Sequence, residues 1–354
     1  MENFDILYNK FLNCQTSYLD WNDIEQIDND IVSKYDELVF PDDDVKNSIK
    51  KKVCVIKLNG GLGTTMGCTG PKSLIQIKNN YTFMDIILKQ NILNYPIPLV
   101  FMNSFYTHKQ TSEYLADKHN EMTIMGFEQN YYPRIIKETK ECLNINSSDF
   151  DHLYPPGHGD LLQSLSDTGM LDKLIDSGIE YAFISNSDNL GATMDFGILN
   201  DLINSSIDFA IELTPKTIND IKGGTLIKYK NKYVMFEVAQ CSPENLFEFA
   251  SVNKFKYFNT NNIWIKLSAI KDLMKTDYVK DLDIIINNKK LKDGRECVQL
   301  EYAIGSMVKF FNKVKCYLVP RDRFVPVKNN DDLNLVRSDA YTLNEETWKI
   351  IKND

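Results

Sequence analysis

Residues 53–73 read VCVIKLNGGLGTTMGCTGPKS, an apolar run that passes directly into a glycine-rich segment. The apolar run, 53–58, has the length of a buried strand, and a helical pattern follows from Thr82 to Asn91. A strand, a glycine-rich turn and a helix in this order are typical of the opening of a βα unit. The segment therefore predicts an α/β fold.

The rest of the chain repeats this alternation. Further strand-length apolar runs lie at 99–102, 122–127, 181–185, 209–213 and 232–238, and helical patterns lie at 109–118 and 160–176. Continuous apolar strands separated by helices predict a Rossmann-like fold, a mostly parallel mixed sheet with helices on both faces. Ligands of such sheets bind beyond the carboxyl ends of the strands, so the loops that follow strands are the candidate sites.

Three segments are expected along the chain. Residues 1–45 mix acidic and apolar positions and end at the break Pro41-Asp42-Asp43-Asp44, which predicts a short helical lead-in. Residues 46–330 form the main α/β domain. Residues 331–354 are expected to form a short helical segment at the carboxyl end.

Composition narrows the class of protein. With 43% hydrophobic residues among 354, the chain can bury a substantial core. A net charge of -9 argues against nucleic acid as a partner, because nucleic acids select a basic face. No basic and apolar leader opens the chain and no apolar run is long enough to cross a membrane, so a cytoplasmic protein without membrane contact is expected. The seven cysteines are scattered singly and are expected to be free buried thiols.

The glycine-rich segment is suited to phosphate. Five glycines between residues 60 and 70 allow backbone N–H groups to converge on phosphate oxygens without a Cβ in the way. Pro71 stands between Gly70 and Lys72, which excludes a Walker A loop, and Met66 occupies the place of the third glycine of a dinucleotide fingerprint. Two interpretations of the segment are left. It is either a phosphate-binding loop whose lysine is held in place by the preceding proline, or a tight turn that binds nothing.

Two further positions carry possible chemistry. Asp188 follows the apolar strand 181–184, where a carboxylate at the end of a strand can hold Mg2+ against bound phosphates. A solvated or turn-capping aspartate fits the residues equally well. His158 lies between Gly157 and Gly159 after two prolines, in a loop with few apolar neighbours. It is either a ligand-binding histidine or a turn histidine.

Taken together, these segments resemble the eukaryotic-type UTP:glucose-1-phosphate uridylyltransferases, or UDP-glucose pyrophosphorylases. The resemblance covers about residues 50 to 340 in the family's order. Besides the glycine-rich segment, it rests on FEQ at 127–129, YPR at 132–134, YPPGHGD at 154–160, SNSDNLGAT at 185–193, KGGT at 222–225, FNTNN at 258–262, QLE at 299–301 and RFVPVK at 323–328.

The resemblance implies a nucleotidyltransferase domain of the glycosyltransferase-A type over residues 46–330, and it implies a role for each matched residue. For UTP these residues are Leu58, Asn59, Gly60, Gly61, Lys72, Gln129, Gly157, Asp188 and Lys328. For the sugar phosphate they are His158, Asn186, Ser187, Gly224, Asn261, Asn262 and Glu301. Lys72 and Lys328 are the implied catalytic residues, Asp188 is the implied Mg2+ ligand, and Mg2+ is the implied cofactor.

The implied reaction is a reversible attack of a glucose 1-phosphate oxygen on the α-phosphorus of UTP, which releases pyrophosphate and leaves UDP-glucose. A phosphate oxygen is already an anionic nucleophile at neutral pH, so positioning and charge neutralisation suffice. The alternatives are a pyrophosphorylase of broader or N-acetylhexosamine specificity and an inactive UDP-sugar sensor. The presence of Lys72, Asp188 and Lys328 argues against the sensor.

Two departures from the family pattern stand out. Thr69 occupies a place where related enzymes commonly carry a lysine, which could weaken binding of the triphosphate. The sequence also stops soon after Lys328, where eukaryotic relatives continue into a left-handed β-helix domain that supplies oligomer contacts. We therefore expect a monomer or a dimer rather than an octamer.

Overall fold

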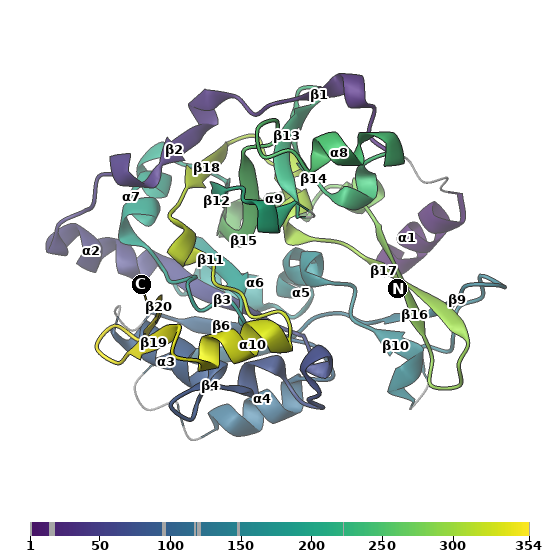
Figure 1. Ribbon diagram of the computed structural model, residues 1–354, viewed down its shortest axis with the longest axis horizontal. Coiled ribbons are helices and arrows are strands. Elements are labelled where there is room, and N and C mark those ends of the chain that lie inside the picture. The colour runs from purple at the N-terminus through teal and green to yellow at the C-terminus, as the bar shows by residue number, and fades with distance from the viewer. Residues whose placement is uncertain are drawn as a thin grey trace.

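The computed structural model describes residues 2–13, 18–93, 97–116, 118, 122–146, 149–221 and 223–353. At its centre lies an eight-stranded sheet in the order β2-β18-β12-β15-β11-β3-β6-β7 (Figure 1). Its strands are β2 (Val32–Lys34), β18 (Val314–Leu318), β12 (Phe209–Pro215), β15 (Tyr257–Lys266), β11 (Tyr181–Asn186), β3 (Val53–Asn59), β6 (Leu99–Asn103) and β7 (Ile124–Glu128).

Every neighbouring pair in this sheet is parallel except the two that involve β15, which runs antiparallel to β11 and β12. All seven residues of β3 are buried, as expected of a central parallel strand covered on both faces. The prediction of a mostly parallel mixed sheet is confirmed.

Helices cover both faces of the sheet, as the sequence predicted. Cys54, Ile56 and Leu58 of β3 belong to one core, while Val53 and Val55 belong to the other, because successive side chains of a strand point to opposite faces. The first core is completed by α1 (Glu2–Asn13), α5 (Leu161–Asp167), α6 (Met170–Asp176) and α9 (Leu267–Leu273). The second is completed by α2 (Asp43–Ile49), α3 (Phe83–Leu93), α4 (His108–Leu115), α7 (Phe196–Ser205) and α10 (Asn330–Arg337).

Smaller sheets and one short helix surround this body. One sheet joins β1 (Ile24–Glu25), β13 (Thr225–Tyr229) and β14 (Lys232–Phe236), and another joins β16 (Ile285–Lys290), β17 (Glu296–Glu301) and β9 (Ile135–Ile136). Two-stranded pairs are β4 (Gln76–Lys78) with β5 (Tyr81–Thr82), β8 (Tyr132–Pro133) with β10 (Leu153–Tyr154), and β19 (Tyr341–Asn344) with β20 (Lys349–Lys352). The short helix is α8 (Leu246–Phe249).

The two terminal segments are less helical than predicted. The lead-in, 1–45, is helical in α1 and at the start of α2, but it also contributes β1 and β2, and β2 pairs with β18 at the edge of the main sheet. The segment 331–354 contains most of α10 and then the hairpin β19–β20. Strands of two to four residues show no usable periodicity, and their pairing partners decide them.

Three other expectations need correction. The helix predicted at 160–176 is two helices, because Gly169 adopts a left-handed φ of 71° between α5 and α6. The strand predicted at 232–238 ends at Phe236 and lies outside the main sheet. Among the cysteines, Cys54, Cys241, Cys297 and Cys316 are free and buried, whereas Cys68 is half-buried and Cys142 exposed; Cys14 lies outside the described residues.

A buried polar network ties the strands together at one end of the sheet. The guanidinium of Arg323 donates to both carboxylate oxygens of Glu212, at 2.8 and 2.6 Å, and Glu212 is fully buried on β12. The same carboxylate accepts from Trp264 Nε1 at 2.9 Å and Asn262 Nδ2 at 3.0 Å. This arrangement satisfies a charge that would otherwise be costly to bury.

None of the helices in the described residues combines the length and the apolar character that a membrane span requires.

The network predicts the effect of removing one charge. Arg323→Met leaves the Glu212 carboxylate buried without its counterion, so we expect a loss of roughly 3–5 kcal/mol in unfolding free energy. The double variant Glu212→Gln with Arg323→Met should recover part of the loss, because no charge is then stranded. Urea unfolding followed by circular dichroism measures both variants. A single variant within about 1 kcal/mol of the unmodified protein would contradict this account.

Candidate functional site

A cleft of about 390 Å³ lies beyond the carboxyl ends of β3 and β11. This is the position expected of a ligand site in an open α/β sheet. The fold brings eleven of the sequence-predicted residues into its wall: Leu58, Gly60, Gly61, Lys72, Gln129, Gly157, His158, Asn186, Ser187, Asp188 and Glu301.

The glycine-rich segment folds back on itself at the edge of the cleft. Gly63 N donates to Gly70 O at 3.1 Å and Lys72 N donates to Gly61 O at 3.1 Å, so the two arms of the loop lie side by side. Pro71 then starts a short 3₁₀ turn that contains Lys72. The backbone therefore carries the Lys72 side chain from a fixed base into the cleft.

Lys72 and Asp188 meet in this cleft as an ion pair. The Lys72 ammonium donates to Asp188 Oδ2, and both side chains are more than four-fifths buried. Asp188 Oδ1 is also buried but has no hydrogen-bond partner among the described residues. A buried carboxylate oxygen without a partner is costly unless something binds it, so this atom is a candidate ligand for a cation.

The residues around Asp188 are suited to Mg2+ rather than to a metal held by protein side chains alone. Among the described residues, no group of three or more histidine, cysteine, aspartate or glutamate side chains gathers in a form that could hold a metal ion. Mg2+ does not need such a group, because it keeps several waters and takes one or two carboxylates together with substrate phosphates. The unpartnered oxygen of Asp188 fits that pattern of binding.

Gln129 lies against Gly60 of the glycine-rich loop. A Cβ at position 60 would come within 2.1 Å of Gln129 Nε2, so only glycine permits this approach. Gln129 follows β7, and its backbone N–H donates to Asn103 O at 2.8 Å. The side-chain Oε1 is buried and has no hydrogen-bond partner in the described part of the chain, which leaves an acceptor available to a ligand.

The loop at 157–159 is shaped by close contact with Tyr302. Gly157 has a left-handed φ of 88°, and a Cβ there would lie 2.8 Å from Tyr302 O. His158 Nδ1 accepts from Ile304 N at 3.1 Å, so the ring proton of the neutral form resides on Nε2. Burial lowers the pKa of His158 to about 4. His158 is therefore a neutral hydrogen-bond donor at neutral pH.

A β-bulge places Asn261 beside the cleft. The pairing of β12 with β15 shifts between Glu212 and Leu213, and Asn261 adopts a left-handed φ of 59° in the extra length. Its side-chain Nδ2 donates to Asn186 Oδ1 at 3.0 Å. Glu301 also lines the cleft; its carboxylate accepts from Asn287 Nδ2 at 2.9 Å, and burial raises its pKa.

Two of the predicted residues, Asn59 and Asn262, have side chains that donate hydrogen bonds to other side chains of the protein. Asn59 Nδ2 donates to Asn103 Oδ1 at 2.7 Å and to Thr111 Oγ1 at 3.0 Å, so it supports the loop from behind. Asn262 is fully buried and takes part in the Glu212 network. Neither residue belongs to the wall of the cleft.

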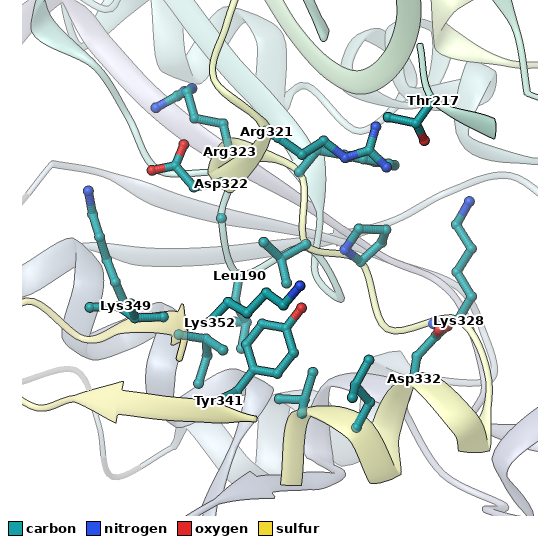
Figure 2. Close-up of a pocket in the computed structure, with 18 of the residues that line it drawn as sticks. Leu190, Thr217, Arg321, Asp322, Arg323, Lys328, Asp332, Tyr341, Lys349 and Lys352 are labelled. Carbon is teal, nitrogen blue, oxygen red and sulfur yellow. Dashed lines mark hydrogen bonds between the residues drawn. The ribbon is translucent and has the colours of Figure 1, made fainter. Parts of the chain in front are cut away.

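Lys328 lines a second and larger cavity, of about 1080 Å³, between the 190–193 and 321–328 segments and the α10 and β19–β20 region (Figure 2). In Figure 2, Lys328 lies at the end of the loop that precedes α10, with Asp332 beside its backbone. The backbone N–H of Val327 donates to Asp188 O at 3.2 Å, so the chain just before Lys328 touches the cleft's aspartate.

Glu237 was missed by sequence reasoning. A Cβ at Gly224 would overlap its carboxylate, at 2.2 Å from Oε1, so Gly224 and Glu237 are in direct contact. Burial raises the pKa of Glu237 to about 7, and the charge of Lys328 opposes that shift. The only signal in the sequence was the small residue at 224, because a lone glutamate after a strand carries no pattern of its own.

Fold and cleft together define the class of the protein, an α/β nucleotidyltransferase. The family model described as "UTP--glucose-1-phosphate uridylyltransferase" matches residues 1–354, and the chain belongs to that family. The family assignment from the sequence is thus confirmed.

Similar proteins and solved structures support the same family assignment. An enzyme of this name from Solanum tuberosum is 46% identical over 98% of the chain and 74% of its own length, and one from Dictyostelium discoideum is 42% identical over 98% and 70%. A Leishmania major UDP-glucose pyrophosphorylase mutant, solved in complex with UDP-glucose, superposes with a TM-score of 0.86 at 30% identity, over 99% of this chain and 78% of its own. The chain spans about three quarters of these relatives.

The lowered pKa of His158 predicts that its ring does not titrate in the physiological range. Because the folded protein binds the ring proton only near pH 4, the imidazole should stay neutral from pH 8 down to about 5.5. NMR of the histidine ring signals, with His158→Asn to assign the signal, measures this. A midpoint at or above the usual value of about 6.5 would contradict the prediction.

Proposed function

We propose that this chain transfers a uridylyl group between UTP and glucose 1-phosphate, forming UDP-glucose and pyrophosphate in a reversible reaction. The observation that carries the proposal is the buried, unpartnered Oδ1 of Asp188 beside Lys72, in a cleft that also holds Gln129 and His158. The names of the curated relatives and the UDP-glucose in the Leishmania major complex support it.

The uridine is proposed to lie on the side of the cleft formed by Gly60 and Gln129. An amide offers one donor and one acceptor, which pairs with the imide edge of uracil. Gln129 Oε1 has no partner among the described residues, and the absence of a Cβ at Gly60 lets the Gln129 amide lie against the backbone at the edge of the cleft. Leu58, Gly61 and Gly157 complete this wall.

The phosphates are proposed to lie between Lys72 and Asp188. Asp188 would hold Mg2+, which would supply positive charge to neutralise the phosphates. Lys72, whose ammonium is paired with Asp188 Oδ2, would hold phosphate oxygens, and Asp188 would hold the metal ion. Lys328 is assigned to the phosphates on the family resemblance and on the contact of its segment with Asp188.

The sugar phosphate is proposed to lie on the side of His158 and Asn186. A neutral His158 donates from Nε2 without adding charge, while Ser187, Asn261 and Glu301 offer groups that match hydroxyls. Gly224 O accepts from Asn259 N at 3.0 Å, and Asn259 Oδ1 accepts from Asn261 N at 2.9 Å, so Gly224 is joined to Asn261. Glu237 contacts Gly224, and we add it to the proposed sugar site. Asn262 is assigned a supporting role, because its side chain is already paired with Glu212. Asn59 stays among the residues proposed for UTP, because its Nδ2 is paired but its buried Oδ1 has no partner among the described residues.

A cytoplasmic location and a monomeric or dimeric state remain predictions. The reaction supports the first, since both of its substrates are small, highly charged phosphate esters.

The first test removes each charge of the cleft. Lys72→Ala should lower turnover by at least about 100-fold, because a positioned charge on a phosphoryl transition state is typically worth several kcal/mol. Asp188→Ala should abolish Mg2+-dependent turnover. The matched controls are Lys271→Ala and Asp172→Ala, which remove the partners of an exposed 2.7 Å ion pair and should leave turnover unchanged. A folded Lys72 or Asp188 variant that keeps more than about half of the activity would refute the site.

The second test concerns the base. Unmodified protein should strongly prefer UTP to ATP and GTP, and Gln129→Leu should lower kcat/KM for UTP by about 10- to 100-fold, since a buried polar edge then loses its partner. Gln163→Leu, at a half-buried position of α5 outside the cleft wall, serves as the control. Steady-state kinetics with each nucleotide decides it, and equal use of ATP by the unmodified protein would exclude the assignment of Gln129.

A further inference from the structure

Lys57 is a buried lysine in a position that the strand pattern reserves for an apolar side chain. It follows Val53 and Val55 on the same face of β3, and only 2% of its surface is exposed. Its ammonium donates to Ser185 Oγ and to Ala192 O, each at 2.8 Å. It is not among the residues that line the cleft. Burying a lysine without hydrogen-bond partners costs free energy, so the two acceptors of its ammonium group indicate which parts of the chain Lys57 joins.

The two acceptors bracket the loop that carries Asp188. Ser185 pairs directly with Lys57 in the sheet and precedes the loop. Residues 186–188 then line the cleft, and at Ala192 the chain comes back to the Lys57 ammonium. One side chain therefore joins the start of this loop to its end. It does so from β3, the strand that leads into the phosphate loop and Lys72.

Other contacts hold the middle of the loop but do not join its two ends. Gln90 Nε2 donates to Leu190 O at 3.0 Å, and Val327 N donates to Asp188 O at 3.2 Å. These contacts come from α3 and from the chain before Lys328. Lys57 differs from them because it couples both ends of the loop to the strand of the phosphate loop.

We propose that Lys57 is a positioning residue for uridylyl transfer, which closes the 186–191 loop so that the Asp188 carboxylate is held at a fixed place relative to Lys72. This inference rests on the proposed function of Asp188. Fixed placement matters because metal and phosphate ligands act only within a narrow geometry, and displacements of the order of 1 Å are costly to the rate.

The clamp does not depend on the charge of Lys57. Burial and the neighbouring charge of Arg323 lower the pKa of Lys57 to about 7, whereas the carboxylates of Glu212 and Asp188 oppose that shift. A neutral amine keeps two N–H groups, one for each acceptor. A lysine therefore serves the role in either protonation state, and an apolar side chain of the same length does not.

The experiment compares Lys57→Met with a matched control on the same strand as Ser185. Methionine preserves the length and the packing of the stem but donates no hydrogen bond. The control is Tyr181→Phe, at the opposite end of β11, which removes buried hydrogen bonds to Leu202 O and Ile207 O and leaves the loop alone. The readouts are amide hydrogen exchange of residues 186–192 without nucleotide or metal, kcat, and the Mg2+ concentration for half-maximal activity.

Lys57→Met is expected to speed exchange in this loop at least about 10-fold, to lower kcat at least about 10-fold and to raise the Mg2+ requirement. Tyr181→Phe should lower thermal stability and change none of the three. Loop exchange and Mg2+ requirement within about twofold of the unmodified protein, or equal changes in both variants, would overturn the proposal. If Lys57→Met does not fold, Ser185→Ala removes one bond of the clamp and should show a smaller change of the same kind.

Failure of the proposed function gives a different result. An unmodified protein that makes no UDP-glucose would refute that function, whereas the hydrogen-exchange comparison would still report whether Lys57 holds the loop.

Discussion

The buried ion pair between Glu212 and Arg323 is the constraint on which the site depends. Glu212 belongs to a central strand and Arg323 to the chain just after β18, and the pair is enclosed by donors from Trp264 and Asn262. Because an unpaired charge at this depth is very unfavourable, the Arg323 segment has few alternative places to lie. The position of the chain from Arg323 to Lys328 follows from that requirement.

This constraint reaches the cleft through a short series of hydrogen bonds. Asn189 Nδ2 donates to Asn262 Oδ1 and to Arg323 O, each at 3.2 Å, and Val325 N donates to Asn189 Oδ1 at 2.9 Å. Asn189 is the neighbour of Asp188 in sequence. The buried network thus fixes the residue next to the proposed metal ligand, while Lys57 holds the two ends of the same loop.

The cleft contrasts with this fully paired network. Asp188 Oδ1 and Gln129 Oε1 are buried at its wall without partners in the described part of the chain, and Asn261 retains a left-handed backbone conformation beside it. Native structures leave few buried polar atoms unpaired, and they hold strained backbone where the surrounding structure enforces it. Here the network holds Asn189, next to Asp188, while the bond from Gln129 N to Asn103 O holds the chain at Gln129.

The sequence by itself determined the α/β architecture, the glycine-rich turn after β3 and most of the residues that meet in the cleft. Strand-length apolar runs, helical periodicity and a glycine-rich turn are local features, and parallel strands place the loops after their carboxyl ends at one edge. The tertiary structure alone decided that β2 joins the main sheet, that Asn262 is hydrogen-bonded to Glu212, that Glu237 contacts Gly224, and that Lys57 is bonded to Ser185 and Ala192. Each of these depends on a partner far away along the chain, and no local pattern records which distant side chain a buried polar group will meet.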